Sequence, residues 1–298
     1  MDSTYAQQVL ATEQARIQDY MSVFPITFLY WDYLLTLSDE VQYFWKLPVG
    51  TSTVLFFLNR YVSLLGNFVV TISLFYNFST ESSCQVFHTF RGFLLIVEEM
   101  VVGVLLTVRI YALYDRGKRI LAAMLSVGCI LVMIALFTTL FHRSESSDKI
   151  LPGVDIGCHV AISFALSVQQ AAAWEALLLY NVMLFVMMLL KAHKTHHELR
   201  PLRIPLVDII VRDGSLYFGV MAIANAINIS TFYYPWPFIR ASLTTFASSM
   251  SVTMMSRLMF NLHKVADSGL YASHRTTIGT HSTWPEFRVE DEQLNYDE

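Results

Sequence analysis

Charged residues are scarce in this chain. Asp, Glu, Lys and Arg make up 15% of its 298 residues, whereas soluble domains carry about 25%. Hydrophobic residues make up 54%, and the mean hydropathy is +0.46. A formal net charge of −4 excludes a strongly basic nucleic-acid binder, and three cysteines are too few for a disulfide scaffold. The low charge and the recurring long apolar runs predict an integral membrane protein.

Catalytic and cofactor motifs are also missing. The sequence has no His-Glu-x-x-His, Gly-x-Ser-x-Gly, P-loop or dinucleotide-binding glycine motif. Every lysine lies outside the apolar runs, so none is placed to form a retinal Schiff base. His193, His196 and His197 have a spacing that a metal could use, but a solvated basic loop is the favoured interpretation. We therefore expect no enzymatic activity, no cofactor and no metal.

Seven apolar segments are long enough to cross a bilayer as helices. They cover residues 21–43, 52–75, 90–113, 120–141, 163–190, 214–234 and 238–261. A helix satisfies its own backbone hydrogen bonds in lipid, and none of the segments alternates as the strands of a membrane barrel do. The sequence thus predicts an all-α, polytopic protein with seven transmembrane helices, in a plan like that of a G-protein-coupled receptor.

The segments divide the chain into three parts. Residues 1–20 form a short external segment, 21–263 the seven-helix domain, and 264–298 an acidic cytosolic tail. The tail holds three basic and seven acidic residues, while 1–263 holds 17 of each, so the net charge comes from the tail. Its polar, Ser- and Thr-rich composition predicts disorder. It is either a solvated tail or a segment that binds a partner once phosphorylated.

Basic residues are distributed unequally over the loops and helix ends. With the N-terminus outside, five fall on external segments: Arg16, Arg91, Arg143, Lys149 and Arg240. Twelve fall on internal segments: Lys46, Arg109, Arg116, Lys118, Arg119, Lys191, Lys194, Arg200, Arg203, Arg212, Arg257 and Lys264. Because basic residues favour the cytosolic side, this distribution predicts an external N-terminus and a cytosolic C-terminus.

Three further residues agree with this orientation. Asn77-Phe78-Ser79 is a glycosylation acceptor, which must reach the lumen to be used, and it falls on the external side. Cys84 and Cys158 fall there as well, and disulfides persist in an oxidising compartment. Asn77 is therefore a candidate glycosylation site. Cys84 and Cys158 are a candidate disulfide, with two free thiols as the alternative.

Acidic and amide side chains lie within the apolar segments. A charge at the centre of a membrane helix costs about 2.5–3.5 kcal/mol, so each such group needs a partner or a function. One interpretation is a polar cavity for a ligand or an ion, lined by Glu98, Glu175, Asn225 and Asn228. The other is that these groups hydrogen-bond neighbouring helices together.

Two segments carry polar residues at helical spacing. The second segment has Arg60, Ser63, Asn67 and Thr71. The seventh has small hydroxyl residues separated by three or four positions: Ser242, Thr245, Ser249, Thr253 and Ser256. Lipid offers such groups no hydrogen-bond partner, so both stripes are predicted to face other helices.

Several stretches resemble one known family. The first runs Tyr30-Trp31-Asp32-Tyr33-Leu34-Leu35-Thr36-Leu37-Ser38-Asp39-Glu40-Val41 and continues with Phe57-Leu58-Asn59-Arg60-Tyr61. The others are Arg109-Ile110-Tyr111-Ala112-Leu113-Tyr114, Arg212-Asp213-Gly214-Ser215-Leu216-Tyr217-Phe218 and Ser256-Arg257-Leu258-Met259-Phe260-Asn261-Leu262-His263. Together they resemble a fungal, basidiomycete family of multi-pass membrane proteins known as domain of unknown function 6533. The resemblance implies the architecture and leaves the activity open.

Most of these motifs lie at predicted cytosolic helix ends. A receptor that couples to a cytosolic partner opens at that face, so Arg109, Arg212, Asp213 and Arg257 form a hypothetical switch. The alternative is that they anchor helix ends to lipid headgroups. We expect a receptor-like sensor of an unknown ligand in the plasma membrane or an endomembrane, with a cytosolic signalling partner and no nucleic acid. A transporter or channel for small solutes or ions that uses the buried acids is the alternative.

Overall fold

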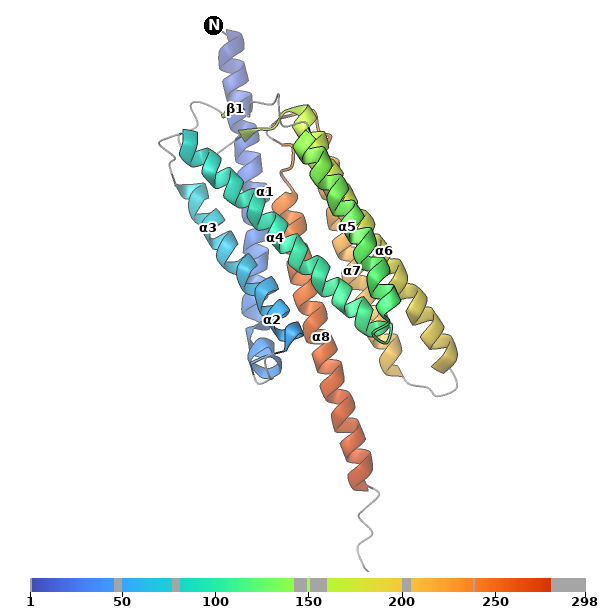
Figure 1. The fold of residues 1–298 in the computed structure, drawn as a ribbon. Coiled ribbons are helices and arrows are strands. Elements are labelled where there is room, and N and C mark those ends of the chain that lie inside the picture. Colours follow the sequence, from blue (N-terminus) through green and yellow to red (C-terminus); the bar gives the residue numbers. More distant parts are fainter. Residues whose placement is uncertain are drawn as a thin grey trace, which may run out of the picture.

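In the computed structural model the described residues are 2–45, 50–76, 81–141, 149–150, 160–199, 205–237 and 239–279. They form a bundle of long helices (Figure 1). The helices are α1 (Asp2–Tyr43), α2 (Thr51–Phe57), the π-helix η1 (Leu58–Val62), α3 (Ser63–Phe75), α4 (Glu81–Leu113), α5 (Lys118–Phe141), α6 (Phe164–Leu199), α7 (Pro205–Phe232) and α8 (Thr244–Gly279). Because α2, η1 and α3 are continuous, each predicted apolar segment corresponds to one helix.

Four of these helices are long and apolar enough to cross a membrane. They include Thr51–Phe75, Lys118–Phe137, Phe164–Lys191 and Gly214–Phe232. The other three, α1, α4 and α8, are more polar along their middle turns. Polar groups of all three point inward: Asp32 of α1 and Glu98 of α4 are each 3% exposed, and the side chains of the Ser and Thr stripe of the seventh segment are at most 3% exposed. The predicted inward orientation of that stripe is confirmed.

Helix α8 lies at the centre of the packing. It contacts α1, α4 and α7, while α6 packs between α5 and α7. Aromatic rings fill the junction of α1, α2 and α8: Phe44 stacks on Phe56 with ring centroids 3.8 Å apart, and Phe260 meets both edge-on. By contrast, α5 leaves most of its apolar side chains exposed. An outward apolar face of this kind suits contact with lipid tails.

The π-helix η1 places two neighbouring polar residues inside the bundle. A π turn is wider than an α turn and occurs mostly as a single turn within a helix. Asn59 and Arg60 are adjacent in the sequence, yet they are only 3% and 4% exposed. Their side chains point to different helices, because Asn59 bonds Val252 and Ser256 of α8 while Arg60 pairs with Glu40 of α1.

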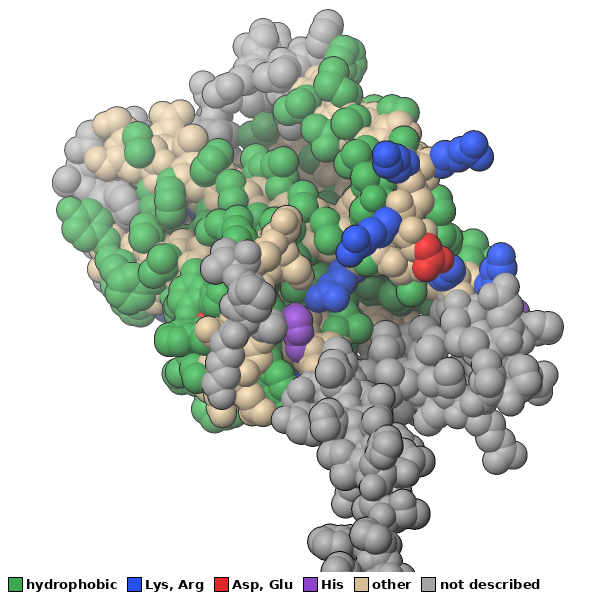
Figure 2. All heavy atoms as spheres, turned by 60° about the horizontal axis from the view of Figure 1, so that its bottom comes forward, with side chains coloured by type: hydrophobic (Ala, Val, Ile, Leu, Met, Phe, Trp, Pro, Cys, Tyr) green, Lys and Arg blue, Asp and Glu red, His purple; other side chains and the backbone are tan. Residues whose placement is uncertain are grey.

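Basic side chains gather at the end of the bundle where α4 meets α5 and α6 ends (Figure 2). Arg116, Lys118 and Arg119 are exposed around the α4–α5 turn. The Lys191 amine on α6 lies 3.1 Å from the Asp115 carboxylate on that turn, which ties the two helix ends together. The N-terminus of α1 lies at the opposite end of the bundle (Figure 1).

Several helices are longer than the sequence predicts: α4 begins at Glu81, α6 ends at Leu199 and α7 begins at Pro205. The extensions of α1 and α8 are the longest. Helix α1 begins at Asp2, so the external segment 1–20 continues the first helix, and α8 runs to Gly279 into the segment 264–298 that composition predicts to be disordered. Nucleating a helix is costly, but extending an existing one is not. Both extensions contain good helix formers such as Ala and Leu, and neither contains Pro. Residues 280–298 lie outside the described residues.

The connection between α7 and α8 is longer than the tight hairpin expected at Tyr234–Pro237. Helix α8 begins at Thr244, although the seventh segment was predicted from residue 238. Arg240 accounts for the difference, because its guanidinium donates to the backbone carbonyls of Tyr234, Pro235 and Ile162 at 2.8–3.0 Å. Its burial lowers the pKa of this arginine. Ile162 follows β2 (Val160–Ala161), which pairs antiparallel with β1 (Lys149–Ile150).

Candidate functional site

A buried ion pair joins α1 to the π-helix. The Arg60 Nε atom lies 2.7 Å from the Glu40 Oε2 atom, and their side chains are 4% and 0% exposed. Removing two charges from water costs several kcal/mol per ion, and the pair repays this only when its remaining donors and acceptors are satisfied. The surroundings of both groups therefore decide whether the arrangement is stable.

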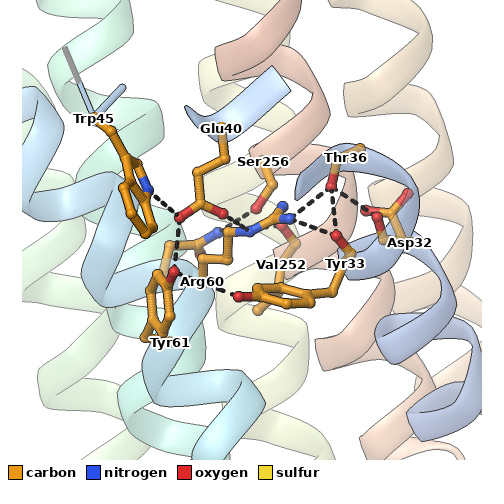
Figure 3. A network of polar contacts seen from close by, with 10 residues as sticks. Asp32, Tyr33, Thr36, Glu40, Trp45, Arg60, Tyr61, Val252 and Ser256 are labelled. Carbon is orange, nitrogen blue, oxygen red and sulfur yellow. Dashed lines mark hydrogen bonds and ion pairs between the residues drawn. The ribbon is translucent and has the colours of Figure 1, made fainter. Parts of the chain in front are cut away.

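Further polar contacts satisfy both members of this pair (Figure 3). The Arg60 Nη2 atom donates to the Tyr33 carbonyl at 2.9 Å and to the Thr36 hydroxyl at 2.7 Å. The guanidinium also lies over the Tyr33 ring, 4.5 Å from its centroid. Both residues lie on α1, Thr36 about one turn and Tyr33 about two turns before Glu40.

The second oxygen of Glu40 has two donors of its own. The Tyr61 hydroxyl donates to Oε1 at 2.8 Å, and the Trp45 indole N–H donates to it at 3.1 Å (Figure 3). Tyr61 follows Arg60 directly on η1, so the same π turn supplies both the cation and a hydroxyl donor. The Glu40 carboxylate is thus held from three sides.

A second ion pair joins α1 to α8. The Arg257 Nε atom lies 2.5 Å from the Asp32 Oδ1 atom, with the Asp32 side chain 4% exposed and the Arg257 side chain 41% exposed. One turn away on α8, the Asn59 amide from η1 donates to the Val252 carbonyl and the Ser256 hydroxyl, both at 3.1 Å. We call these contacts, together with the Glu40–Arg60 pair, the α1–η1–α8 network.

A small cavity lies within this network. Its volume is about 10 Å³, and its polar lining comes from Asp32, Arg60, Thr253 and Ser256. A volume of about 10–15 Å³ holds one water molecule. The Thr253 hydroxyl is buried and has no hydrogen-bond partner among the described residues, so a single bridging water fits the chemistry of this lining.

A separate polar layer surrounds Glu98 on α4. Its Oε1 atom accepts a 2.9 Å bond from the Asn67 amide of α3, and its Oε2 atom accepts a 2.5 Å bond from the Ser248 hydroxyl of α8. Toward the N-terminal end of α4, Arg91 donates to the hydroxyls of Ser22 and Thr245. These bonds hold α4 against α1, α3 and α8, as the interhelical interpretation of Glu98 expects.

The four residues predicted to line a ligand cavity have different surroundings. Glu98 is enclosed as described, whereas Glu175 on α6 accepts a 2.6 Å bond from the Tyr233 hydroxyl just beyond α7. Asn225 and Asn228 on α7 are fully buried, and their side-chain amides have no hydrogen-bond partner among the described residues. A cavity shared by all four stays a prediction.

The four residues of the predicted switch are also separated. Arg257 pairs with Asp32, while the Arg109 guanidinium of α4 contacts the Met259 sulfur of α8. Arg257 lies on α8 and Arg109 contacts Met259 two residues further along it, so two of the four meet at the same segment of α8. Arg212 and Asp213 lie on α7, and their side chains are outside the described residues.

The predicted external sites are only partly described. Cys84 is 3% exposed near the start of α4, but Cys158 lies outside the described residues. Asn77 also lies outside them. The disulfide and the glycosylation site therefore stay predictions, and Cys129 on α5 is an exposed free cysteine.

Sequence reasoning missed the acidic half of the α1–η1–α8 network. Asp32 and Glu40 lie within the family-like stretch, but no arginine partner was predicted for either. A usable signal was present, because Asp32, Thr36 and Glu40 recur at intervals of four and so share one helix face. Arg60 in the second segment was a charge in need of a buried acid.

Comparison with known proteins supports the family resemblance. Residues 20–65 match the model of a family described as a family of unknown function, DUF6533. No curated protein and no solved structure matches the chain. The matched stretch contains Asp32, Glu40, Asn59 and Arg60, which are the α1 and η1 residues of the network.

Proposed function

We propose that this protein is a receptor-like sensor whose seven helices all cross the membrane. In this proposal an external ligand changes the position of α8 relative to α1, and a cytosolic protein recognises the change. The observation that carries it is the α1–η1–α8 network, which joins three helices through two ion pairs whose acids are almost fully buried.

The burial of the polar groups supports seven spans. Helices α1, α4 and α8 carry charges that would be costly against lipid. Glu40, Glu98 and Asp32 are instead at most 3% exposed, and they face other helices. The four apolar helices surround this polar interior with lipid-compatible surface. A bundle that hides these acids is suited to a membrane at the level where they lie.

The distribution of basic residues supports an external N-terminus. The α4–α5 turn and the end of α6 carry the exposed basic side chains described above (Figure 2), and a cytosolic location suits them. Asn77, Cys84 and Cys158 then fall outside. The resemblance to the DUF6533 family further suggests a fungal, basidiomycete source.

The energetics of the network support a switching role. Replacing a buried ion pair with apolar residues is often neutral or stabilising, so such a pair is weak evidence for stability alone. A pair with alternative partners can instead hold one of two helix arrangements. Arg257 is suited to this, because its side chain is 41% exposed and can exchange Asp32 for water.

The ligand in this proposal binds in the outer half of the bundle, near Glu98, Glu175, Asn225 and Asn228. The fully buried, unpartnered amides of Asn225 and Asn228 support a polar contact there. Helix α8 connects that region to the network, since Ser248 bonds Glu98 and Ser256 bonds Asn59. A ligand that displaced α8 would thereby act on the Asp32–Arg257 pair.

Topology is tested first. A glycosidase-sensitive mass shift that Asn77→Gln removes, together with a protease-accessible C-terminus in inverted vesicles, is the expected result. A tail that is protected in those vesicles would reverse the orientation and overturn the proposal.

Proximity labelling from the C-terminus then tests sensing. We expect signalling proteins to be enriched and their enrichment to change in the Asp32→Asn variant, which releases Arg257. The matched control is Asp115→Asn, which breaks the exposed Lys191–Asp115 pair. If no signalling protein is enriched in any of the three proteins, the receptor proposal fails.

A transporter or channel is the second candidate, and the buried acid Glu99 favours it. Both of its carboxylate oxygens are buried without a hydrogen-bond partner among the described residues, as expected of a group that a moving ion visits. Flux of an ion or solute into liposomes holding the purified protein, lost in Glu99→Gln, would select this function over sensing.

A further inference from the structure

Exposed basic side chains from two helix ends form one surface at the end of the bundle (Figure 2). Arg116, Lys118 and Arg119 lie on the α4–α5 turn and at the start of α5, and Lys194 lies near the end of α6. All four side chains are exposed. We call these four residues the basic surface.

The basic surface lacks acids that would balance its charge. Asp115, the acid on the same turn, is engaged by Lys191 at 3.1 Å. Among the described residues, no acid forms an ion pair with Arg116, Lys118 or Arg119. The first turn of α5 also contains no acidic residue, although negative charge is favoured at the start of a helix and positive charge is not. Like charges so close together repel one another, so an anion from elsewhere would lower the electrostatic free energy of this surface.

A segment of opposite charge follows α8 in the same chain. Residues 286–298 contain one basic residue, Arg288, and six acidic ones: Glu286, Glu290, Asp291, Glu292, Asp297 and Glu298. We call residues 286–298 the acidic segment. Its net charge is of the sign that the basic surface requires.

The acidic segment is close enough to reach the basic surface. Helix α8 leaves the bundle at the end where α4 meets α5 (Figure 1). From Lys264 to Gly279 it rises by about 22 Å, whereas residues 280–290 can span up to about 36 Å when extended. Helix α4 packs on α8, and the axes of packed helices are about 8–10 Å apart. The chain beyond Gly279 is therefore long enough to fold back along α8 to the α4–α5 turn.

We propose that the acidic segment docks on the basic surface. Each exposed ion pair between them is weak and screened by salt, but several pairs act together. Tethering raises the local concentration of the segment to about millimolar, and an anionic lipid or an acidic protein has to compete with it. Docking covers an end of the bundle that would otherwise be open to a partner, which makes the contact autoinhibitory. It goes beyond the proposed function and does not depend on it, because surface and segment lie at the same end whichever way the protein is oriented.

The mobility of a spin label on the acidic segment tests the contact. Gln293→Cys carries the label in the full-length Cys129→Ala protein, in nanodiscs of uncharged phosphatidylcholine. We expect an immobile spectral component that is lost as NaCl rises from about 0.1 M to about 1 M, because the Debye length falls from about 10 Å to about 3 Å. Lys118→Glu with Arg119→Glu should lower the ratio of docked to free segment about tenfold. Arg16→Glu, which reverses an exposed charge at the opposite end of the bundle, should leave that ratio unchanged.

Reversing the charges of the segment separates ion pairing from an effect on the fold. Glu290→Lys with Asp291→Lys and Glu292→Lys should free the label as well, and adding these changes to the Lys118→Glu, Arg119→Glu protein should restore part of the immobile component. A label that is mobile in the parent protein at every salt concentration would overturn the proposal, and so would a combined variant without any recovery.

Nanodiscs that contain phosphatidylserine test the competing occupant. We expect the label to keep its immobile component there at low salt. A label as mobile as in the Lys118→Glu, Arg119→Glu protein would mean that lipid headgroups occupy the basic surface in place of the acidic segment, and would refute the docking.

Discussion

Asp32 of α1 and Arg257 of α8 form a 2.5 Å ion pair, although 225 residues separate them in the sequence. Eight residues further along α1, Glu40 pairs with Arg60 of η1. The first helix is thus bound by charge to two other helices within about two turns. Because both acids are buried, neither can lose its arginine without a large cost unless the helices move.

Loss of charge at Glu40 should destabilise the fold strongly. Glu40→Gln leaves the Arg60 charge buried and unpaired, and breaking such a pair costs about 3–5 kcal/mol. Unfolding in mixed detergent micelles measures this free energy. In the double variant Glu40→Met, Arg60→Met, most of the loss should be recovered, because no charge remains buried.

The control for that experiment is an exposed pair. Asp115→Asn breaks the Lys191–Asp115 contact, in which the Asp115 side chain is 87% exposed, and should cost about 0–1 kcal/mol. Equal losses for Glu40→Gln and Asp115→Asn would contradict the importance given to the buried pair.

Gly66 on α3 should not tolerate a larger residue. An added Cβ atom at Gly66 would overlap the Leu94 side chain of α4, which is only 7% exposed. Overpacking of this kind costs about 1–3 kcal/mol, so Gly66→Ala should lower the melting temperature. Gly103→Ala on α4 is the matched control, since an added Cβ meets no atom within 4 Å. A Gly66→Ala protein as stable as Gly103→Ala would argue against the close α3–α4 approach.

Protonation of His263 should lower the stability of the protein in mild acid. This residue lies beyond the predicted seventh span and meets the Phe44 ring edge-on, with centroids 4.5 Å apart. Burial, and then the nearby Arg109 charge, lower the pKa of His263 below its ordinary 6.5. As the pH drops, His263 therefore takes up a proton in the unfolded chain before it does so in the folded protein. The free energy of unfolding decreases as a result below about pH 6.5.

Melting temperatures measured between pH 8 and pH 5 check this expectation. The decline should be shallower in His263→Gln, whose side chain does not titrate in this range. Identical pH profiles for the two proteins would show that His263 is not protected from protonation.

Cys84 and Cys158, the cysteines predicted to lie outside, should be joined. Peptide mapping without reductant is expected to yield one linked peptide that contains Cys84 and Cys158, with Cys129 alkylated. Cys84→Ser, Cys158→Ser and the double variant should lose equal stability, because each removes the same bond. Alkylation of all three cysteines in the native protein would refute the disulfide.

The sequence predicted the helices well because their signals are local. Apolar runs are long enough to recognise, and the Ser and Thr stripe of α8 recurs at helical spacing, so its burial could be anticipated. The extensions of α1 and α8 were missed, since polar composition alone does not separate a solvated helix from a disordered segment.

The network could not be read from the sequence for a different reason. Pairing Asp32 with Arg257 requires knowing which faces of α1 and α8 meet, and nothing local encodes that. The π turn at Asn59 and Arg60 has no recognisable sequence signal either. Arg60 was expected to lie on a polar stripe, but its partner Glu40 was not identified.

The proposed movement of α8 relative to α1 is tested most directly by measuring the distance between the ends of these two helices that the network joins. Spin labels at Val41 and Lys264, in a Cys129→Ala background, report this distance by dipolar broadening of the continuous-wave spectrum, a method for short separations, since Lys264 contacts Asp39 at 2.7 Å. Val41 and Lys264 are 42% and 45% exposed, so labels fit there. Asp32→Asn should shift or broaden the distance distribution, while Asp115→Asn should leave it unchanged. A distribution in Asp32→Asn that is identical to that of the parent protein would contradict the role of the Asp32–Arg257 pair in positioning α8.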